Sequence, residues 1–306
     1  MNKESKIFIA GHKGMVGSAC WRLLENEGYF NLIGKSSKDL DLRDQKAVEE
    51  FYEIEKPDIV IAAAAKVGGI WVNNQYPYEF LMDNMLIQNN LIKFSLEYNV
   101  KKFVFLGSSC IYPKHANQPL KEEYLLTDAL EPTNQWYSIA KISGVKLIEA
   151  IRKEFNRDFI ALMPTNLYGP GDNYNLKTSH VLPALIKKFS LASKNNSDVI
   201  LWGTGEPLRE FLHVDDLASA VLFVLKNNLK ESLYNVGSGK EIKIKDLALI
   251  IQNMIGHQGK IIWDDSKPNG TMRKLLDSTK FKSFGWEPKE KLKESINQIL
   301  KNEFQF

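Results

Sequence analysis

The segment KIFIAGHKGMVGSACWRLLENE, residues 6–27, decides the expected fold. Its first five residues form an apolar run that predicts a strand, and the three- and four-residue spacing of apolar residues in 15–27 predicts a helix. Gly11, Gly14 and Gly17 lie between them, where a tight turn, a close approach of the backbone to phosphate and close helix–strand packing require glycine. The helix N-terminus offers free N–H groups to an anion. We therefore expect a nucleotide-binding loop here, rather than an ordinary strand-to-helix turn.

The first half of the chain repeats this alternation of strand and helix. Further strands are predicted at residues 31–34, 58–64, 102–107 and 157–164, and further helices at residues 45–55, 80–98 and 136–155. Each parallel strand pair needs a crossover, so the alternation predicts an α/β fold with a Rossmann-type doubly wound parallel sheet. The continuous apolar strands fit a sheet that helices cover on both faces.

The second half has a looser rhythm, with Gly/Pro turns around residues 203–207 and 267–270. This pattern predicts a smaller, partly interleaved C-terminal substrate domain. Residues 215–225 and 234–237 are expected to return to the main sheet. The expected division assigns residues 1–168 and 210–240 to the dinucleotide-binding domain, and residues 169–209 and 241–306 to the substrate domain.

Composition excludes several classes of protein. The 306 residues include 40 basic and 37 acidic ones, without a basic block, so nucleic acid is not an expected partner. Cys20 and Cys110 are the only cysteines in the sequence, which excludes a disulfide framework and predicts a cytoplasmic location. The N-terminus is polar and no apolar stretch is long enough to cross a bilayer, so no membrane association is expected. No metal is expected either.

The second predicted strand bears on the choice of dinucleotide. NAD binders commonly end this strand with an acidic residue that holds the ribose 2′-hydroxyl. Here the strand is followed by lysines and serines, and the first acid is Asp39. Lys13, with Lys35 or Lys38, has the charge to face a 2′-phosphate, although each lysine alone is equally typical of a solvated surface. The missing acid favours NADP(H) as the cofactor.

Tyr137 and Lys141 lie four residues apart in a predicted helix, so both project from one face. A nearby ammonium favours the phenolate and is expected to lower the pKa of a tyrosine from its usual value of about 10. Ser108 or Ser109 follows the strand at residues 102–107, at the sheet edge where ligands bind. The spacing alone is commonplace, but with the glycine loop it predicts a site for proton and hydride transfer.

Cys110 and His180 form a second candidate pair. A lone thiol after a strand is often a small core residue, and a lone histidine is often a structural hydrogen-bond donor. A thiol and an imidazole can also serve as acid and base on opposite sides of a carbon acid, because their pKa values of about 8.5 and 6.5 lie near neutral pH. Both interpretations stay open at this point.

These residues and several longer strings resemble the extended short-chain dehydrogenase/reductases, and among them the GDP-L-fucose synthase family. The resemblance spans nearly the whole chain. The matching stretches are residues 8–18, 62–70 (AAAAKVGGI), 106–114, 131–134, 163–169 (MPTNLYG), 179–185, 209–216, 234–239 and 273–277. It implies 4-reduction by NADPH, with 3,5-epimerisation, of a GDP-4-keto-6-deoxy-hexose to GDP-L-fucose.

The resemblance also implies a role for individual residues. Ser108, Tyr137 and Lys141 correspond to the reductase triad, and Cys110 and His180 to the epimerisation pair. The implied NADP-binding residues are Gly11, His12, Lys13, Gly14, Met15, Val16, Gly17, Ser37, Lys38, Asp39, Leu40, Asp41, Leu42, Ala63, Leu106, Gly107, Ser108, Ser109, Lys141, Pro164, Thr165, Asn166, Leu167 and His180. The implied GDP-sugar residues are Lys188, Trp202, Arg209, Asn269 and Lys274. Homodimers are implied through the helices at residues 80–98 and 136–155.

Four residues depart from the family pattern. Gln135 and Trp136 stand where Glu-Pro is expected, Lys188 stands where Arg is favoured, and Asn269 stands where Asp is favoured. These departures concern the sugar more than the cofactor. The alternative substrate is therefore a related GDP-4-keto-6-deoxy-heptose, reduced at C4 with or without epimerisation. A non-catalytic dinucleotide-binding sensor on the same fold is a more distant alternative, which the presence of Tyr137 and Lys141 disfavours.

Overall fold

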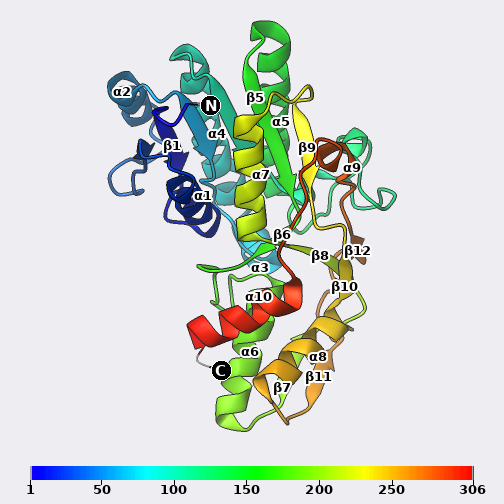
Figure 1. The fold of residues 1–306 in the computed structure, drawn as a ribbon. Coiled ribbons are helices and arrows are strands. Elements are labelled where there is room, and N and C mark those ends of the chain that lie inside the picture. Colours follow the sequence, from blue (N-terminus) through cyan, green and yellow to red (C-terminus); the bar gives the residue numbers. More distant parts are fainter. Residues whose placement is uncertain (1, 305) are drawn as a thin grey trace.

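The computed structural model describes residues 2–304 and 306 of the chain. A parallel sheet of six strands forms the larger part of the molecule (Figure 1). In spatial order the strands are β2 (Leu32–Ile33), β1 (Ile7–Ala10), β3 (Ile59–Ala62), β4 (Lys102–Leu106), β5 (Asp158–Pro164) and β9 (Leu233–Val236). The order reverses between β1 and β3, which leaves a crevice for a ligand at the carboxyl ends of these two strands.

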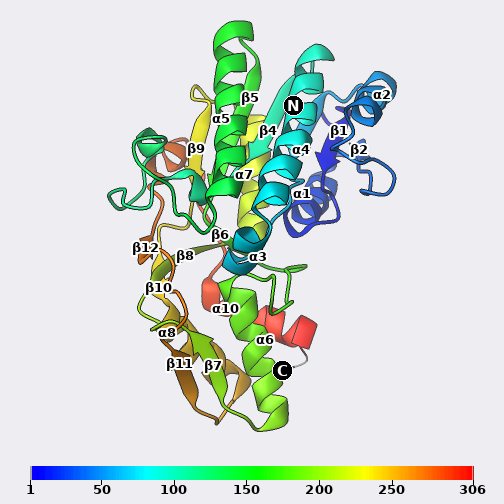
Figure 2. The same cartoon turned by 180° about the vertical axis from the view of Figure 1, so that it is seen from behind.

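Helices cover both faces of this sheet. In Figure 1 the nearer face carries α1 (Met15–Asn26) and α7 (Val214–Lys226), which pack against each other. Figure 2 shows the opposite face, covered by α2 (Gln45–Glu55), α4 (Pro77–Glu97) and α5 (Gln135–Phe155). The predicted Rossmann-type doubly wound sheet is therefore confirmed, and each predicted element of the first half agrees with an observed one to within three residues at either end.

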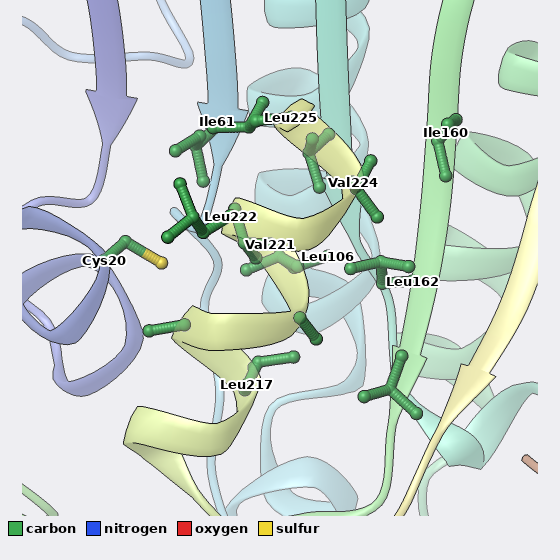
Figure 3. Close-up of a cluster of buried hydrophobic side chains, with 14 of the residues drawn as sticks. Cys20, Ile61, Leu106, Ile160, Leu162, Leu217, Val221, Leu222, Val224 and Leu225 are labelled. Carbon is green, nitrogen blue, oxygen red and sulfur yellow. The ribbon is translucent and has the colours of Figure 1, made fainter. Parts of the chain in front are cut away.

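Apolar side chains on both faces of the sheet explain why these short strands form at its centre. Every residue of β1, β3 and β4 is buried, as expected for strands covered on two sides. Figure 3 shows one of the resulting cores, where Leu217, Val221 and Val224 of α7 face Ile160 and Leu162 of β5. The predicted return of residues 215–225 and 234–237 to the main sheet is confirmed, because they form α7 and β9.

The smaller part of the molecule is built from short strands and three helices (Figures 1 and 2). Strand β8 (Leu208–His213) pairs with β10 (Glu241–Lys243), β12 (Arg273–Lys274) and β6 (Asn166–Tyr168), and β7 (Val199–Trp202) pairs with β11 (Ile261–Asp264). The helices are α6 (Val181–Asn195), α8 (Ile244–Ile255) and α10 (Leu292–Ile299). Their apolar faces form a separate core with Leu201 and Phe211.

The chain crosses between the two parts more than once, as expected for an interleaved arrangement. The boundary expected at residue 210 falls inside β8, which pairs in the smaller part. Phe281 of α9 (Thr279–Lys282) and Trp286 belong to the core of the main sheet, although they follow β12 in sequence. The division into residues 1–168 with 210–240 and 169–209 with 241–306 stays a prediction.

Glu210 joins the two parts through a buried carboxylate. Its Oε1 accepts a hydrogen bond from Gly239 N at 2.7 Å, and its Oε2 accepts one from Leu276 N at 2.9 Å. Its backbone oxygen accepts hydrogen bonds from the side chains of Thr165 and Asn166, which follow β5. Burial raises the pKa of the Glu210 carboxyl above its usual value, and these N–H donors oppose that shift. One side chain thereby connects the main sheet to β8 and β12.

The remaining described segments are short. They are α3 (Ile70–Gln75), the turns at Ser109–Ile111 and Glu122–Tyr124, and the last helical turn at Leu300–Phe304. Within the described part of the chain, no helix combines the length and apolar character needed to span a membrane.

Replacing Ile160 with alanine should destabilise the fold by about 3 kcal/mol, because the side chain is fully buried on β5 and its loss leaves a cavity. Ile54→Ala is a matched control, since Ile54 is 77% exposed on α2 and should change stability by less than about 0.5 kcal/mol. Equilibrium unfolding in urea measures both. Equal losses for the two variants would contradict the assignment of Ile160 to the core.

Candidate active site

The glycine loop after β1 has the geometry of a phosphate-binding turn. Gly11 has a φ of +83°, and a Cβ on it would lie 2.8 Å from Ala64 N at the end of β3. A Cβ on Gly17 would lie 2.1 Å from Gly11 O, so the loop and α1 make contact only because both positions are glycine. Gly14 precedes the first turn of α1 without a side-chain cap, and that turn holds no acidic residue. The loop thus fits the pyrophosphate of a dinucleotide.

His12 and Lys13 extend this loop toward β2. The His12 ring packs against Gly34 and lies 5.6 Å, between ring centroids, from Trp21. Burial, and secondly the charge of Lys13, lower the pKa of His12, which favours its neutral form. Its Nδ1 is buried without a hydrogen-bond partner among residues 2–304 and 306, so a ligand donor or acceptor fits here.

Asp39 is the first acid after β2, and it is already engaged. Ser36 Oγ donates a hydrogen bond to Asp39 Oδ2 at 2.5 Å, and this bond holds the pKa of the Asp39 carboxyl below its usual value. The charges of Lys13 and Lys35 contribute in the same direction. Three lysines were considered for binding a 2′-phosphate. One of them, Lys35, has its Nζ 3.9 Å from Glu55 Oε1, so its charge is partly neutralised.

Some of the other predicted cofactor residues use their side chains within the protein. Leu40 is buried in the core beside α2, and Arg43 NH2 forms an ion pair with Asp41 at 2.8 Å. Thr165 Oγ1 donates to Glu210 O at 3.2 Å, and Leu167 packs against the core. The other predicted cofactor residues follow strands of the main sheet at their carboxyl ends, where ligands bind in such folds. They are residues 37–42 after β2, 63 after β3, 106–109 at the end of β4 and 164–167 at the end of β5.

A cavity of about 460 Å³ adjoins these strand ends, and its volume is typical of a site for a small-molecule ligand. Nine of the predicted catalytic and GDP-sugar residues line it. They are Ser108, Cys110, Tyr137, His180, Lys188, Trp202, Arg209, Asn269 and Lys274. These residues come from β4, α5, α6, β7, β8 and β12 and the loops beside them, so the two parts of the molecule build the cavity together.

Ser108, Cys110 and Tyr137 gather at one wall of the cavity. Ser108 Oγ donates to Cys110 Sγ at 3.1 Å and accepts from Cys110 N at 3.3 Å, so the serine and the thiol are held side by side. Burial, and secondly the nearby Cys110, raise the pKa of Tyr137. The phenol therefore keeps its proton at neutral pH.

Lys141 lies behind this wall and is buried. Its Nζ donates to Leu106 O at 2.9 Å and lies 5.8 Å from the centroid of the Tyr137 ring, so the two side chains share a helix face as predicted. The expectation that the lysine lowers the pKa of Tyr137 is wrong for this structure, because Nζ faces Leu106 O and burial dominates both groups. Burial lowers the pKa of Lys141 to about 7. The amine therefore exchanges a proton near neutral pH.

His180 faces the same cavity as Cys110, as the chemistry of the pair requires. It precedes α6, whose first turn starts at Val181. Partial desolvation beside the cavity, and secondly the charge of Lys274, lower the pKa of its imidazole. Gly69 N donates to Thr178 O at 3.0 Å, which ties the loop before His180 to the loop after β3.

Two of the cations predicted to bind the GDP-sugar, Lys188 and Arg209, line the cavity. Burial lowers the pKa of Arg209 to about 10 and also lowers the pKa of Lys188, so both gain from an anionic partner. Lys188 Nζ donates to Ile200 O at 2.8 Å. Asn269 Oδ1 accepts from Thr204 N at 2.8 Å, and Trp202 leaves about half of its side chain open to the cavity and solvent.

Two features of the site went unforeseen in the sequence. Lys274, implied only as a GDP-sugar residue, also donates from Nζ to Cys110 Sγ at 3.7 Å. Val67 of the loop after β3 and Ile70 and Trp71 of the following helix α3 also line the cavity. The string AAAAKVGGI entered the sequence analysis only through its resemblance to the family. Its paired glycines, Gly68 and Gly69, were the signal that could have identified it as part of the site.

Comparison with known proteins identifies the family of the chain. The model of the family described as "NAD dependent epimerase/dehydratase family" matches residues 7–237, which hold the glycine loop, Tyr137 and Lys141. Two curated relatives match almost the whole chain. A putative GDP-L-fucose synthase 2 of Arabidopsis thaliana is 52% identical over 97% of this chain and 91% of its own length. The GDP-L-fucose synthase of Escherichia coli K12 is 48% identical over 94% of this chain and 92% of its own.

A solved structure is similar over the same extent. The GDP-mannoheptose C4 reductase from Campylobacter jejuni with NADP bound has a TM-score of 0.90 and 38% identity, covering 98% of each chain. The resemblance drawn from the motifs is therefore confirmed. With its glycine loop, its doubly wound sheet and these identities, the chain belongs to the NAD dependent epimerase/dehydratase family, in the branch that contains the GDP-L-fucose synthases.

Proposed function

We propose that this chain is an NADPH-dependent enzyme that epimerises C3 and C5 and reduces C4 of a GDP-4-keto-6-deoxy-hexose, giving GDP-L-fucose. One observation carries the proposal: a single cavity is lined by the residues for reduction, by the two residues for proton transfer at carbon and by the cations for a nucleotide. The names of the two curated relatives, both GDP-L-fucose synthases, favour the hexose over the heptose.

The glycine loop, Lys13 and the strand ends around residues 106–109 would hold NADP(H). The NADP bound in the Campylobacter relative supports this cofactor. The hydrogen bond from Ser36 to Asp39 supports it as well, because it occupies the first acid after β2, which an NAD binder would use for the ribose 2′-hydroxyl. When bound, NADPH supplies the hydride. Lys13 supplies a positive charge on the 2′-phosphate side, and Lys141 lies beside the strand end where it can orient the ribose.

Reduction of a ketone requires a proton on the new alkoxide, and Tyr137 is the group that holds one. Its raised pKa keeps Oη protonated until charge develops on the C4 oxygen. Ser108 donates a second hydrogen bond to that oxygen from the same wall. Lys141, with a pKa of about 7, returns a proton to the phenol near neutral pH.

Epimerisation uses the same ketone. A carbonyl at C4 acidifies the protons on C3 and C5, so an enolate forms when hydrogen bonds from Ser108 and Tyr137 stabilise its oxygen. Cys110 and His180 then remove and return protons on opposite faces of the ring, which inverts each centre. Their placement on one cavity supports this assignment.

The nucleotide lies on the other side of the cavity in this proposal. Lys188 and Arg209 supply cations for the pyrophosphate, and a guanidinium can bind it through two parallel hydrogen bonds. Trp202 offers a flat face for the base, and Asn269 supplies polar groups near the same wall. Lys274 reaches from β12 toward Cys110, so it lies between the sugar and the nucleotide.

We also propose a homodimer formed through α4 and α5, and a cytoplasmic location. These helices pack together on one face of the sheet (Figure 2) and expose a row of large apolar side chains. The row consists of Tyr78, Met82, Leu86, Ile139 and Leu147. A second copy of the same row would cover it in a twofold arrangement. The cytoplasm fits because Cys110 and Cys20 are both free thiols and the proposed chemistry needs Cys110 reduced.

The product assay tests the function. Purified enzyme with NADPH and GDP-4-keto-6-deoxymannose should yield GDP-L-fucose by NMR, and NADPH should be oxidised faster than NADH because the second strand lacks the acid that NAD binders use. Turnover only with the corresponding heptose would replace the hexose by the alternative substrate. Binding of NADPH without turnover of either sugar would leave only the non-catalytic sensor.

Replacing Tyr137 with phenylalanine should lower kcat for NADPH oxidation by roughly 10²- to 10⁴-fold, because the variant lacks the proton donor to the C4 oxygen. Binding of NADPH, measured by fluorescence titration, should change little. Tyr98→Phe is the matched control, because Tyr98 caps α4 away from the cavity. A Tyr137→Phe variant with wild-type kcat would remove the phenol from the reaction.

Leu86→Glu should dissociate the dimer, raising its Kd by at least about tenfold, because the twofold axis would bring two carboxylates into an apolar contact. Sedimentation velocity measures the change. Leu191→Glu places the same charge on a comparably exposed leucine of α6 and should leave the assembly intact. A wild-type sedimentation pattern for Leu86→Glu would place the interface elsewhere.

A further inference from the structure

A small polar chamber adjoins the main cavity behind Cys110. Its volume is about 20 Å³, which is room for one water molecule. Cys110, Glu131, Asn134 and Lys274 line both the chamber and the main cavity, so the chamber opens toward the reacting sulfur. The other walls include Lys114 and the loop before β12.

Two oxygen atoms of the chamber residues have unused hydrogen-bonding capacity. Asn134 Oδ1 and Glu131 Oε2 are buried, and neither accepts a hydrogen bond from any residue that the structure describes. Glu131 Oε2 lies 3.2 Å from Lys114 Nζ, in an ion pair without hydrogen-bond geometry. Buried oxygens in proteins are nearly always hydrogen-bonded, so these two indicate a small donor in the chamber.

The sulfur supplies a third polar partner. Cys110 Sγ accepts from Ser108 Oγ on the cavity side and from Lys274 Nζ on the chamber side. The thiol, Glu131 and Asn134 therefore offer a water molecule three hydrogen-bonding partners. Buried waters in proteins typically have two to four. Lys274 thus fixes the position of the sulfur from β12.

We propose that this chamber binds a water molecule that carries protons between the Cys110 thiol and the Glu131 carboxylate, and so exchanges the Cys110 proton with solvent. The inference rests on the proposed epimerisation. The S–H bond breaks as the water oxygen takes the proton, and another proton of that water passes to Glu131 Oε2. Glu131 then releases the proton to solvent. No electrons are transferred, and the same steps in reverse return a proton to the Cys110 sulfur.

The proposed reaction needs such a route because it inverts two centres in one sugar. Each inversion leaves both Cys110 and His180 in the opposite protonation state from the one in which they began, since one gains a proton and the other loses one; the relay concerns the Cys110 proton. On the main-cavity side, Cys110 faces the sugar in the proposed complex. Glu131 has 14% of its side chain exposed and its partner Lys114 has 36%, so the chamber side leads outward. The relay thus resets Cys110 between the first and the second centre.

The test separates proton exchange from reduction. GDP-4-keto-6-deoxymannose is incubated in D₂O without NADPH, and deuterium at C3 and C5 is followed by NMR. Glu131→Gln keeps the shape of the side chain and should slow exchange by about tenfold or more. Reduction of ketone that the wild type has already epimerised, measured as NADPH oxidation, should fall much less. Glu131→Asp should restore most of the exchange, because it restores a carboxylate.

Two further variants define the outcomes. Glu123→Gln removes an exposed carboxylate outside the chamber and should behave as wild type, whereas Cys110→Ser should abolish exchange. Deuterium exchange at the wild-type rate in Glu131→Gln would overturn the relay. An equal loss of deuterium exchange and NADPH oxidation in this variant would also overturn it, because it would indicate a structural role for Glu131. A wild-type enzyme that exchanges no deuterium at either carbon would instead refute the proposed epimerisation.

Discussion

The buried carboxylate of Glu210 is the constraint on which the site depends. It accepts hydrogen bonds from Gly239 and Leu276, while its backbone oxygen accepts two more from the residues that follow β5. A buried carboxylate without such donors would be costly, so the segments that supply them are held close together. Arg209 precedes Glu210 directly and Lys274 lies two residues before Leu276. The cations of the substrate side are thereby set against the ends of the main sheet.

The electrostatics of the cavity follow from burial more than from direct pairing. Tyr137 is held protonated and Lys141 is brought to a pKa of about 7 by the same apolar surroundings. Arg209 and Lys188 are likewise destabilised as cations until an anion arrives. The site therefore favours the ligand it is proposed to bind, because a pyrophosphate offsets the cost of burying these charges.

The sequence was most informative where chemistry depends on local spacing. The glycine loop, the strand end at Ser108 and the four-residue step from Tyr137 to Lys141 each lie within one strand–helix unit, so pattern alone located them. Contacts between distant segments could not be read in this way. Lys274 meets Cys110 across 164 residues, and β12, which carries it, is only two residues long. The pKa of Tyr137 also escaped prediction, because burial is a property of the folded cavity.

The cavity has two kinds of wall, and they differ in how freely they can change. Cys110 and Tyr137 stand near strand and helix ends fixed by the packed sheet. Val67 and Leu176 lie in loops and Trp71 lies in the short helix α3, and all three are partly open to solvent. A lineage can therefore exchange bulky rim residues for smaller ones, and so admit a longer sugar, without disturbing the proton chemistry beneath.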